Sequence, residues 1–384
     1  MTVASLIGWL WLALAALGSL YMVMAARSVR RFFAAAPMPP MRSEAVTILK
    51  PLHGDEPRLA DNLASFLAQY HSGPIQLLCG VQRADDPAIA AVEGLRALHP
   101  DTRIDLVVDP TLFGANRKIS NLINMTSAMA HEVVVLSDSD IAVAPDYLAR
   151  LLAALDEPGV GAATCLYRGR GDASFWSRFG AAGLSYQFLP NAVFASARGL
   201  GDACMGSTIA LRRDTLNRIG GFARFADILA DDHAIGQAVR ALGLRVVIPP
   251  MLVTHGSDET GFGALWRHEL RWAATVRSIT PAAAYAGSLI TIPLPLALIG
   301  MIAHPLAGLA LAIVAMMARL MVARRIDAVA GTPTASHWLL PARDLLSFAI
   351  FVTSFVARSV DWRGARLTMG QGGRIAPEME SLGR

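Results

Sequence analysis

Cysteine is scarce in this chain of 384 residues, which contains only Cys79, Cys165 and Cys204. These three are too few and too widely spaced for a disulfide framework or a zinc site, and we interpret them as buried thiols. Charged side chains are also scarce, at 17 % of the residues, whereas a soluble domain has about 25 %. Because 54 % of the residues are hydrophobic and the mean hydropathy is +0.43, we expect part of the chain to lie in a membrane.

Charge is absent from the first 26 residues. A run of about 20 apolar residues is long enough to cross a bilayer. Arg27, Arg30 and Arg31 follow directly, and basic residues stay on the cytoplasmic side of a membrane. A cleaved signal peptide carries its positive charge before the apolar run rather than after it. We therefore expect residues 1–26 to be a retained transmembrane signal anchor, with the following residues in the cytoplasm.

A second stretch without Lys, Arg, Asp or Glu runs from Ser278 to Ala318. Its length fits two membrane crossings with a tight turn near His304, and basic residues from Arg319 onward follow it. Residues 281–323 are therefore predicted to form a transmembrane hairpin. A third apolar block, residues 345–357, is short for a crossing. Residues 338–360 are accordingly predicted to form either a short transmembrane segment or a re-entrant one.

Between these ends, residues 42–262 have ordinary polarity and contain no repeat or low-complexity segment. Short β-rich runs alternate there with helix-like stretches, which is typical of an α/β fold with a mostly parallel, doubly wound sheet. Such sheets bind ligands beyond the carboxyl ends of their strands. The predicted strands are residues 45–50, 75–81, 103–108, 132–137, 159–166, 206–212 and 244–249.

Two carboxylates directly follow one of these predicted strands in the sequence VVVLSDSD. Asp138 and Asp140 are two positions apart at the ligand edge, where they would repel each other unless a cation lay between them. Mg²⁺ and Mn²⁺ prefer hard oxygen ligands, often one or two carboxylates together with phosphate oxygens. The pattern predicts a metal–diphosphate site at Asp138 and Asp140, with a pair of solvated turn residues as the alternative.

Two further acidic pairs lie near the same edge. Asp231 and Asp232 begin a helix-like stretch, where a carboxylate either caps the helix or, with a pKa raised by burial, serves as a general base. Asp85 and Asp86 follow the second predicted strand and precede a proline, so a simple turn is the alternative to a ligand contact there.

Residues 263–280 are predicted to form an amphipathic helix at the membrane interface. Its apolar residues share one helical face, and its tryptophans and arginines stand directly before the predicted hairpin. Arg271 is also a candidate for a second role, because an arginine that faced the crevice would hold a phosphate.

In this order, and between membrane segments, these elements resemble the ceramide glucosyltransferase-like glycosyltransferases of families 2 and 21. The resemblance covers nearly the whole chain. It rests on the fragments QRADDPAI, SDSDI, LADDHAI and HELRW, and also on NRKISNL and MGSTIALRRDTL. The chain departs from the family pattern at His268, where the family has Gln or Arg, and at Asp140, where ceramide enzymes often have Gly.

The resemblance implies a GT-A catalytic domain and a role for each matching residue. Asp86 would contact the uridine of the donor, and Asp232 would be the catalytic base. Asp138 and Asp140 would hold the donor diphosphate on Mg²⁺ or Mn²⁺. Further nucleotide-sugar contacts are expected from Lys50, Lys118, Arg271 and Trp272. Surface solvation is the alternative for the two lysines. In some GT-A enzymes a histidine near the position of His255 binds the metal, and a buried histidine without that role is the alternative here.

The resemblance also implies an inverting transfer of a sugar from a UDP-sugar to the hydroxyl of a lipid acceptor. The chain looks most like the bacterial glycosyltransferases of hopanoid biosynthesis. That likeness implies N-acetylglucosamine as the sugar, bacteriohopanetetrol as the acceptor, and a multi-pass protein of the bacterial inner membrane with its catalytic domain in the cytoplasm. The alternatives are glucose transfer from UDP-glucose to ceramide or another glycolipid, a processive polysaccharide synthase, and a non-catalytic nucleotide-binding membrane scaffold. The sequence has no nucleic-acid-binding signature.

Overall fold

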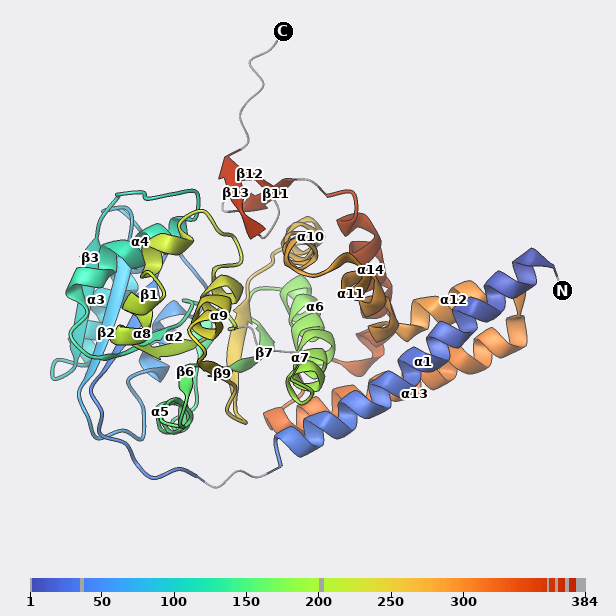
Figure 1. Ribbon diagram of the computed structural model, residues 1–384, viewed down its shortest axis with the longest axis horizontal. Coiled ribbons are helices and arrows are strands. Elements are labelled where there is room, and N and C mark those ends of the chain that lie inside the picture. The colour runs from blue at the N-terminus through green and yellow to red at the C-terminus, as the bar shows by residue number, and fades with distance from the viewer. Residues whose placement is uncertain are drawn as a thin grey trace, which may run out of the picture.

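The computed structural model describes residues 2–34, 38–199, 204–357, 359–362, 365–369 and 373–377. Residues 1 and 358, which belong to two of the predicted membrane segments, lie outside these ranges. A layered α/β part contains most of residues 42–262, and a rod of long helices extends from one side of it (Figure 1).

A mixed sheet of seven strands forms the centre of the α/β part as far as the structure describes it, in the order β3-β2-β1-β4-β8-β6-β9. The first four strands in this order are parallel, whereas β8 runs antiparallel to both of its neighbours. All seven predicted strands are in this sheet, which confirms the α/β fold. The strands are β1 (Val46–Pro51), β2 (Ile75–Val81), β3 (Arg103–Val108), β4 (Val133–Leu136), β6 (Val160–Thr164), β8 (Ile209–Arg212) and β9 (Arg245–Val247).

Helices cover both faces of this sheet (Figure 1), because successive side chains of a strand point to opposite sides. In β1, Ile48 packs into one apolar core and Leu49 into the other. The first core is closed by α2 (Leu59–Ser65), α3 (Ala88–Leu98) and α5 (Tyr147–Leu155), and the second by α4 (Arg117–Met125), α8 (Arg213–Arg218) and α9 (Asp231–Ala241).

Two smaller sheets were not predicted. One has the order β5-β10-β7, with β5 (Ile141–Ala142), β10 (Leu252–Ser257) and β7 (Leu166–Gly171). The other contains β11 (Ser359–Trp362), β12 (Ala365–Met369) and β13 (Ile375–Pro377). The first of these sheets bears directly on the site, because β5 follows the two carboxylates behind β4 and pairs with β10.

The α/β part continues into helices that lie between the sheet and the rod. They are α6 (Phe175–Gly183), the π-helical turn η2 (Leu184–Phe188), α7 (Leu189–Ser196), α10 (Phe262–Ile279) and α11 (Ala282–Gly287). Single 3₁₀ turns are η1 (Thr126–Ala128), η3 (Phe222–Phe225), η4 (Ser288–Thr291) and η5 (His337–Leu339). Leu265, Leu270 and Ala273 of the apolar face predicted for α10 pack against α6 and the later helix α14 (Leu340–Ser354).

Two helices among the described residues are long and apolar enough to cross a membrane, α1 (Val3–Phe32) and α13 (Pro305–Ala330). The segment from α11 to η4 and the helix α12 (Pro293–Ala303) together would form a third, bent by 79°. The chain turns at His304, and α1 lies along α12 and α13 in the rod (Figure 1). In the third predicted segment, α14 (Leu340–Ser354) has 15 residues and packs against α10.

Candidate active site

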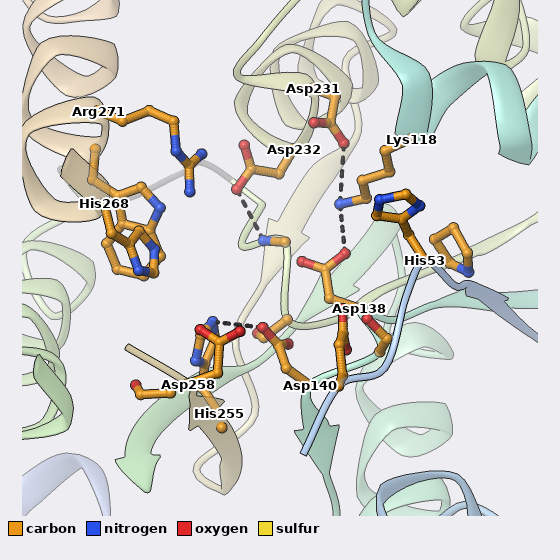
Figure 2. A pocket seen from close by; sticks show the side chains of 18 of the residues that line it. His53, Lys118, Asp138, Asp140, Asp231, Asp232, His255, Asp258, His268 and Arg271 are labelled. Carbon is orange, nitrogen blue, oxygen red and sulfur yellow. Dashed lines mark hydrogen bonds and ion pairs between the residues drawn. The ribbon is translucent and has the colours of Figure 1, made fainter. Parts of the chain in front are cut away.

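A cavity of about 1100 Å³ lies beyond the carboxyl ends of β1 and β4. Its walls are formed by the loops after these two strands, the first turns of α4 and α9, strand β10, and one face of α10. This is the edge at which the sequence places its acidic motifs. Figure 2 shows that their side chains converge on the same space.

Lysine occurs only twice in the chain, and both lysines lie at this edge of the sheet. Lys118, in the first turn of α4, places its Nζ 2.6 Å from Oδ1 of Asp138 and 3.4 Å from Oδ2 of Asp231 (Figure 2). Burial alone would lower the pKa of Lys118, but the two carboxylates outweigh it and raise that pKa. Lys118 therefore places a positive charge between two acidic segments that are far apart in the sequence.

The position of Lys118 follows from the way α4 begins. Oδ1 of Asn116 accepts a hydrogen bond from the N–H of Ile119 at 3.0 Å, which caps the helix. The side-chain amide of Asn116 donates to the carbonyl of Ile228 at 2.7 Å. The start of α4 is thus tied to the loop that leads into Asp231.

Asp140 faces His255 across the junction of β5 and β10. The two strands pair so that Ile141 lies opposite His255, and Oδ2 of Asp140 is 3.3 Å from Nε2 of the histidine (Figure 2). Oδ1 of Asp140 is buried without a hydrogen-bond partner, and burial raises the pKa of this carboxyl. An unpartnered carboxylate oxygen beside an imidazole fits the ligand preference of a divalent cation.

Protein side chains alone do not complete a metal site in the part of the chain that the structure describes. No three His, Cys, Asp or Glu side chains there are arranged around one point. A cation held by Asp138 and Asp140 would therefore keep coordination positions open for other oxygens, as expected of a cation that binds together with a diphosphate.

Asp231 and Asp232 are the first two residues of α9. Oδ2 of Asp232 accepts a hydrogen bond from the N–H of Gly206 at 2.9 Å, and Oδ1 accepts one from the N–H of His233 at 2.7 Å. Burial raises the pKa of Asp232, and it raises the pKa of Asp231 to about 6. Figure 2 shows Arg271 reaching from α10 towards Asp232. A fixed carboxylate with a raised pKa is suited to accept a proton.

Gly206 lies between the two acidic segments. A Cβ on this residue would be 3.1 Å from Oδ2 of Asp138, 3.5 Å from Oδ2 of Asp232 and 3.8 Å from Nζ of Lys118. The two carboxylates and the lysine therefore border the same small space, and the absence of a side chain at Gly206 keeps that space open.

Lys50 lies below the floor of the cavity. Its side chain is fully buried over the ring of Phe66, and its Nζ donates to Oγ of Ser137 at 3.1 Å and to the carbonyl of Asp138 at 2.8 Å. Burial lowers the pKa of Lys50 to about 7. These bonds brace the loop that carries Asp138, and a direct nucleotide contact by Lys50 stays a prediction.

Asp86 is also buried, next to the wall of the cavity. Its Oδ1 accepts hydrogen bonds from the N–H of Gly54 at 2.9 Å and from the N–H of Ala88 at 3.0 Å. Its Oδ2 lies 3.5 Å from Nδ1 of His53, which lines the cavity (Figure 2). Asp86 thus joins the loop after β1 to the start of α3, and its contact with uridine stays a prediction.

Helix α10 presents His268, Arg271 and Trp272 to the cavity. Nδ1 of His268 is hydrogen-bonded to the buried carboxylate of Glu259, and the ring of Trp272 meets His268 edge-on with the ring centres 4.7 Å apart. Burial alone would raise the pKa of Glu259, but the bond with His268 outweighs it and lowers that pKa. The position in which the family has Gln or Arg therefore carries an imidazole fixed by a carboxylate.

The model of the family described as "Glycosyl transferase family 21" matches residues 10–375, which is most of the chain. The chain belongs to glycosyl transferase family 21. It is therefore a glycosyltransferase, and the family-level resemblance seen in the sequence is confirmed.

Curated relatives of this family 21 enzyme include "Ceramide glucosyltransferase 1" of Caenorhabditis elegans, 25 % identical over 88 % of this chain and 74 % of the relative. "Ceramide glucosyltransferase" of Komagataella phaffii is 34 % identical over 31 % of this chain and 24 % of its own length. Among solved structures, a mannosyltransferase from Pyrobaculum calidifontis, in complex with GDP-Man and Mn²⁺, has a TM-score of 0.54 at 20 % identity. That match covers 92 % of this chain and 99 % of the other, and it shows a shared fold.

The structure brings Asp138, Asp140, Asp232, Lys118 and the pair Arg271–Trp272 to one cavity, as the sequence predicts. Sequence reasoning missed Gly206 and Glu259. Gly206 lies in a fragment that carries the family resemblance, but its role depends on carboxylates from two distant segments. No local pattern indicates Glu259, because its contact with His268 depends on the turn between β10 and α10.

Proposed function

We propose that this family 21 enzyme transfers a sugar from a UDP-sugar to a hydroxyl group of a lipid, with inversion at the anomeric carbon. The observation that carries the proposal is the convergence of Asp138, Asp140 and Asp232 with Lys118 in one cavity whose opposite wall is α10. The ceramide glucosyltransferase relatives support a lipid acceptor, and the apolar helices α1 and α13 support work at a membrane.

The chemistry follows from the position of Asp232. Its carboxylate would take the proton from the acceptor hydroxyl, whose oxygen then forms a bond to the anomeric carbon. The bond from that carbon to the oxygen of UDP breaks, and its electron pair leaves with the diphosphate. Because attack and departure occur on opposite faces, an α-linked donor gives a β-glycoside. A base that holds the proton within hydrogen-bond reach typically contributes about 10²–10⁴-fold to the rate.

The leaving diphosphate gains negative charge as its bond to the sugar breaks. Asp138 and Asp140 would hold Mn²⁺ or Mg²⁺, with His255 beside Asp140, and the cation would neutralise that charge when bound. Lys118 and Arg271 supply positive charge from two sides of the cavity, and preorganised charges of this kind stabilise a developing anion. Trp272 would pack against the bound substrate. Asp86 would contact the uridine, and Lys50 would contact the nucleotide or brace the loop that carries Asp138.

For the substrates, we propose N-acetylglucosamine from UDP-N-acetylglucosamine as the sugar and bacteriohopanetetrol, a hopanoid, as the acceptor. The fragments NRKISNL, MGSTIALRRDTL and HELRW support this choice through their likeness to bacterial hopanoid glycosyltransferases. The second candidate is glucose transfer to ceramide, favoured by the names of the curated relatives. The catalytic domain would face the cytoplasm of a bacterium, where UDP-sugars are made, and the protein would lie in the inner membrane.

The test is a product analysis with purified protein in detergent and Mn²⁺. Bacteriohopanetetrol and ceramide are each incubated with UDP-N-acetylglucosamine and with UDP-glucose, and products are identified by mass spectrometry. We expect a hexosamine adduct of the hopanoid. The D232N variant should give no product, whereas D101N, in an exposed turn before β3, should match the wild type. A hexosylceramide would establish the second candidate instead, and no product in any pairing would contradict both.

A further inference from the structure

Two adjacent residues of α14 carry opposite charges, and both are buried. Arg343 is 3 % exposed and Asp344 is 0 % exposed. Neighbours in a helix point about 100° apart, so these side chains reach different partners. One partner belongs to the wall of the active site and the other to the helical rod, which places α14 between the two (Figure 1).

Arg343 forms a two-pronged ion pair with Glu269 of α10. Its Nη1 donates to Oε1 at 2.5 Å, and its Nη2 donates to Oε2 of the same carboxylate. Nη2 also donates to Oγ of Ser347 at 3.0 Å, and a Cβ on Gly183 of α6 would be 3.0 Å from Cζ of Arg343. The guanidinium is thus fixed in one position against both α6 and α10.

Asp344 pairs with Arg319 of α13. Its Oδ1 is 2.7 Å from Nη2 of the arginine, and neither side chain is exposed. Nη1 of Arg319 reaches Sδ of Met22 in α1 at 3.7 Å. The second charge of α14 is therefore anchored to the two helices that are long and apolar enough to cross a membrane.

Glu269 is one residue after His268 and two before Arg271. The residues that face the cavity, His268, Arg271 and Trp272, recur at the spacing of one helical face, and Glu269 lies about 100° away from His268. A rotation of α10 that broke the Arg343–Glu269 contact would move Arg271 away from Asp232. The rotation of α10 about its axis is therefore coupled to an ion pair at the edge of the helical face that lines the cavity.

A buried ion pair is a poor source of stability, because desolvation offsets most of its Coulomb energy. Separating its partners leaves an uncompensated buried charge, which disfavours packing in which Arg343 and Glu269 are apart. We propose that Arg343 is a positioning residue that acts through Glu269, setting the rotation of α10 so that Arg271 faces the donor diphosphate. The Asp344–Arg319 pair holds α14, and hence Arg343, in register with the rod. This inference rests on the proposed function, because it assumes that Arg271 contacts the diphosphate of UDP.

The test measures binding of UDP with Mn²⁺ to the purified full-length protein by calorimetry, together with kcat and KM for the donor. The variants are E269Q, R343M, R343K and the charge swap that combines Glu269→Arg with Arg343→Glu. The matched control is E93Q, which removes an exposed carboxylate paired with Arg96 on α3. Size-exclusion elution and Tm report on folding.

We expect E269Q and R343M to weaken UDP binding about tenfold and to raise the donor KM, since small misplacements of a charge in a site cost about that much or more. R343K, which keeps the charge and loses the two-pronged contact, should fall between R343M and the wild type. The swap should recover most of the UDP binding, and E93Q should bind like the wild type.

UDP binding of E269Q equal to that of E93Q would overturn the inference. So would a folded charge swap that binds UDP as weakly as R343M, because the pair would then be purely structural. If R343M does not fold, E269Q decides the outcome, since glutamine preserves the shape. UDP binding needs no acceptor. A wild type that binds UDP without making a glycolipid would therefore contradict the proposed function, but the comparison of UDP binding among the variants would still test the role of Arg343. A wild type that does not bind UDP contradicts both.

Discussion

At the scale of single residues, we assign the proton transfer to Asp232. Its two oxygens accept hydrogen bonds from the N–H groups of Gly206 and His233, so the carboxylate is fixed at the start of α9. Replacement by asparagine keeps the shape and removes the proton acceptor. We expect D232N to lose about 10²-fold or more in kcat while it still binds UDP with Mn²⁺, as measured by calorimetry. If D232N retained more than about a tenth of the wild-type kcat, Asp232 would not be the base.

The pH dependence of the reaction follows from the same carboxyls. Burial raises the pKa of Asp231 to about 6 and also raises that of Asp232. A general base acts in its deprotonated form, so activity is present above the raised pKa and is lost as the pH falls through it. Because Asp232 is the proposed base, we expect kcat/KM to decrease at a pH above the ordinary aspartate pKa of about 4. Initial rates of UDP release across the pH range test this, and a flat profile down to about pH 4.5 would count against it.

Gly206 offers a steric test of the same site. A Cβ there would be 3.1 Å from Oδ2 of Asp138, which is tighter than an ordinary contact. We expect G206A to fold and to raise the donor KM about tenfold or more, because the methyl group narrows the space bordered by the carboxylates. G94A is the matched control, because a Cβ on Gly94 of α3 meets nothing within 4 Å. Equal donor KM values for G206A and G94A would show that the donor does not occupy this space.

At the scale of elements, strand β10 matters because it carries His255 to the side of Asp140. We expect H255Q to raise the Mn²⁺ concentration for half-maximal activity about tenfold, since loss of a side chain that orients a metal-binding carboxylate typically costs about 10–100-fold in metal affinity. H99Q, at the end of α3, should leave the Mn²⁺ requirement unchanged. An unchanged requirement in H255Q would exclude this histidine from the metal site.

The seven strands of the main sheet could be predicted because most of their residues are apolar, as in Val133–Leu136, and because helical patterns separate several of them. Strands β7 and β10 could not. Their sequences, LYRGRG and LVTHGS, contain glycine and polar residues that are typical of loops, and only pairing with each other makes them strands. The site was predictable where a motif follows an apolar strand, as at Asp138. It was not predictable where a role depends on contact between distant segments, as for Gly206 and Glu259.

At the scale of the whole molecule, the rod of α1, α12 and α13 contains the helices that are long and apolar enough to cross a membrane, and their flanking charges predict an orientation. Arg27, Arg30 and Arg31, at the end of α1, predict that the amino terminus lies outside the cytoplasm and the catalytic domain lies inside. The three native cysteines are buried, so introduced cysteines can report on this. We expect T2C, in intact cells, to react with a membrane-impermeant maleimide and D101C to be protected until the cells are opened. The reverse labelling pattern would show that the topology is inverted, with the active site on the side of the membrane away from the cytoplasmic UDP-sugars.

The central claim is that one carboxylate directs a single displacement at the anomeric carbon of a UDP-sugar. The anomeric configuration of the glycolipid product tests this most directly. It is determined by proton NMR from the coupling constant of the anomeric proton. The account predicts a β-glycoside from the α-linked donor, formed by the wild type and absent with D232N. An α-glycoside would contradict the account, because retention requires a different arrangement of groups around the sugar.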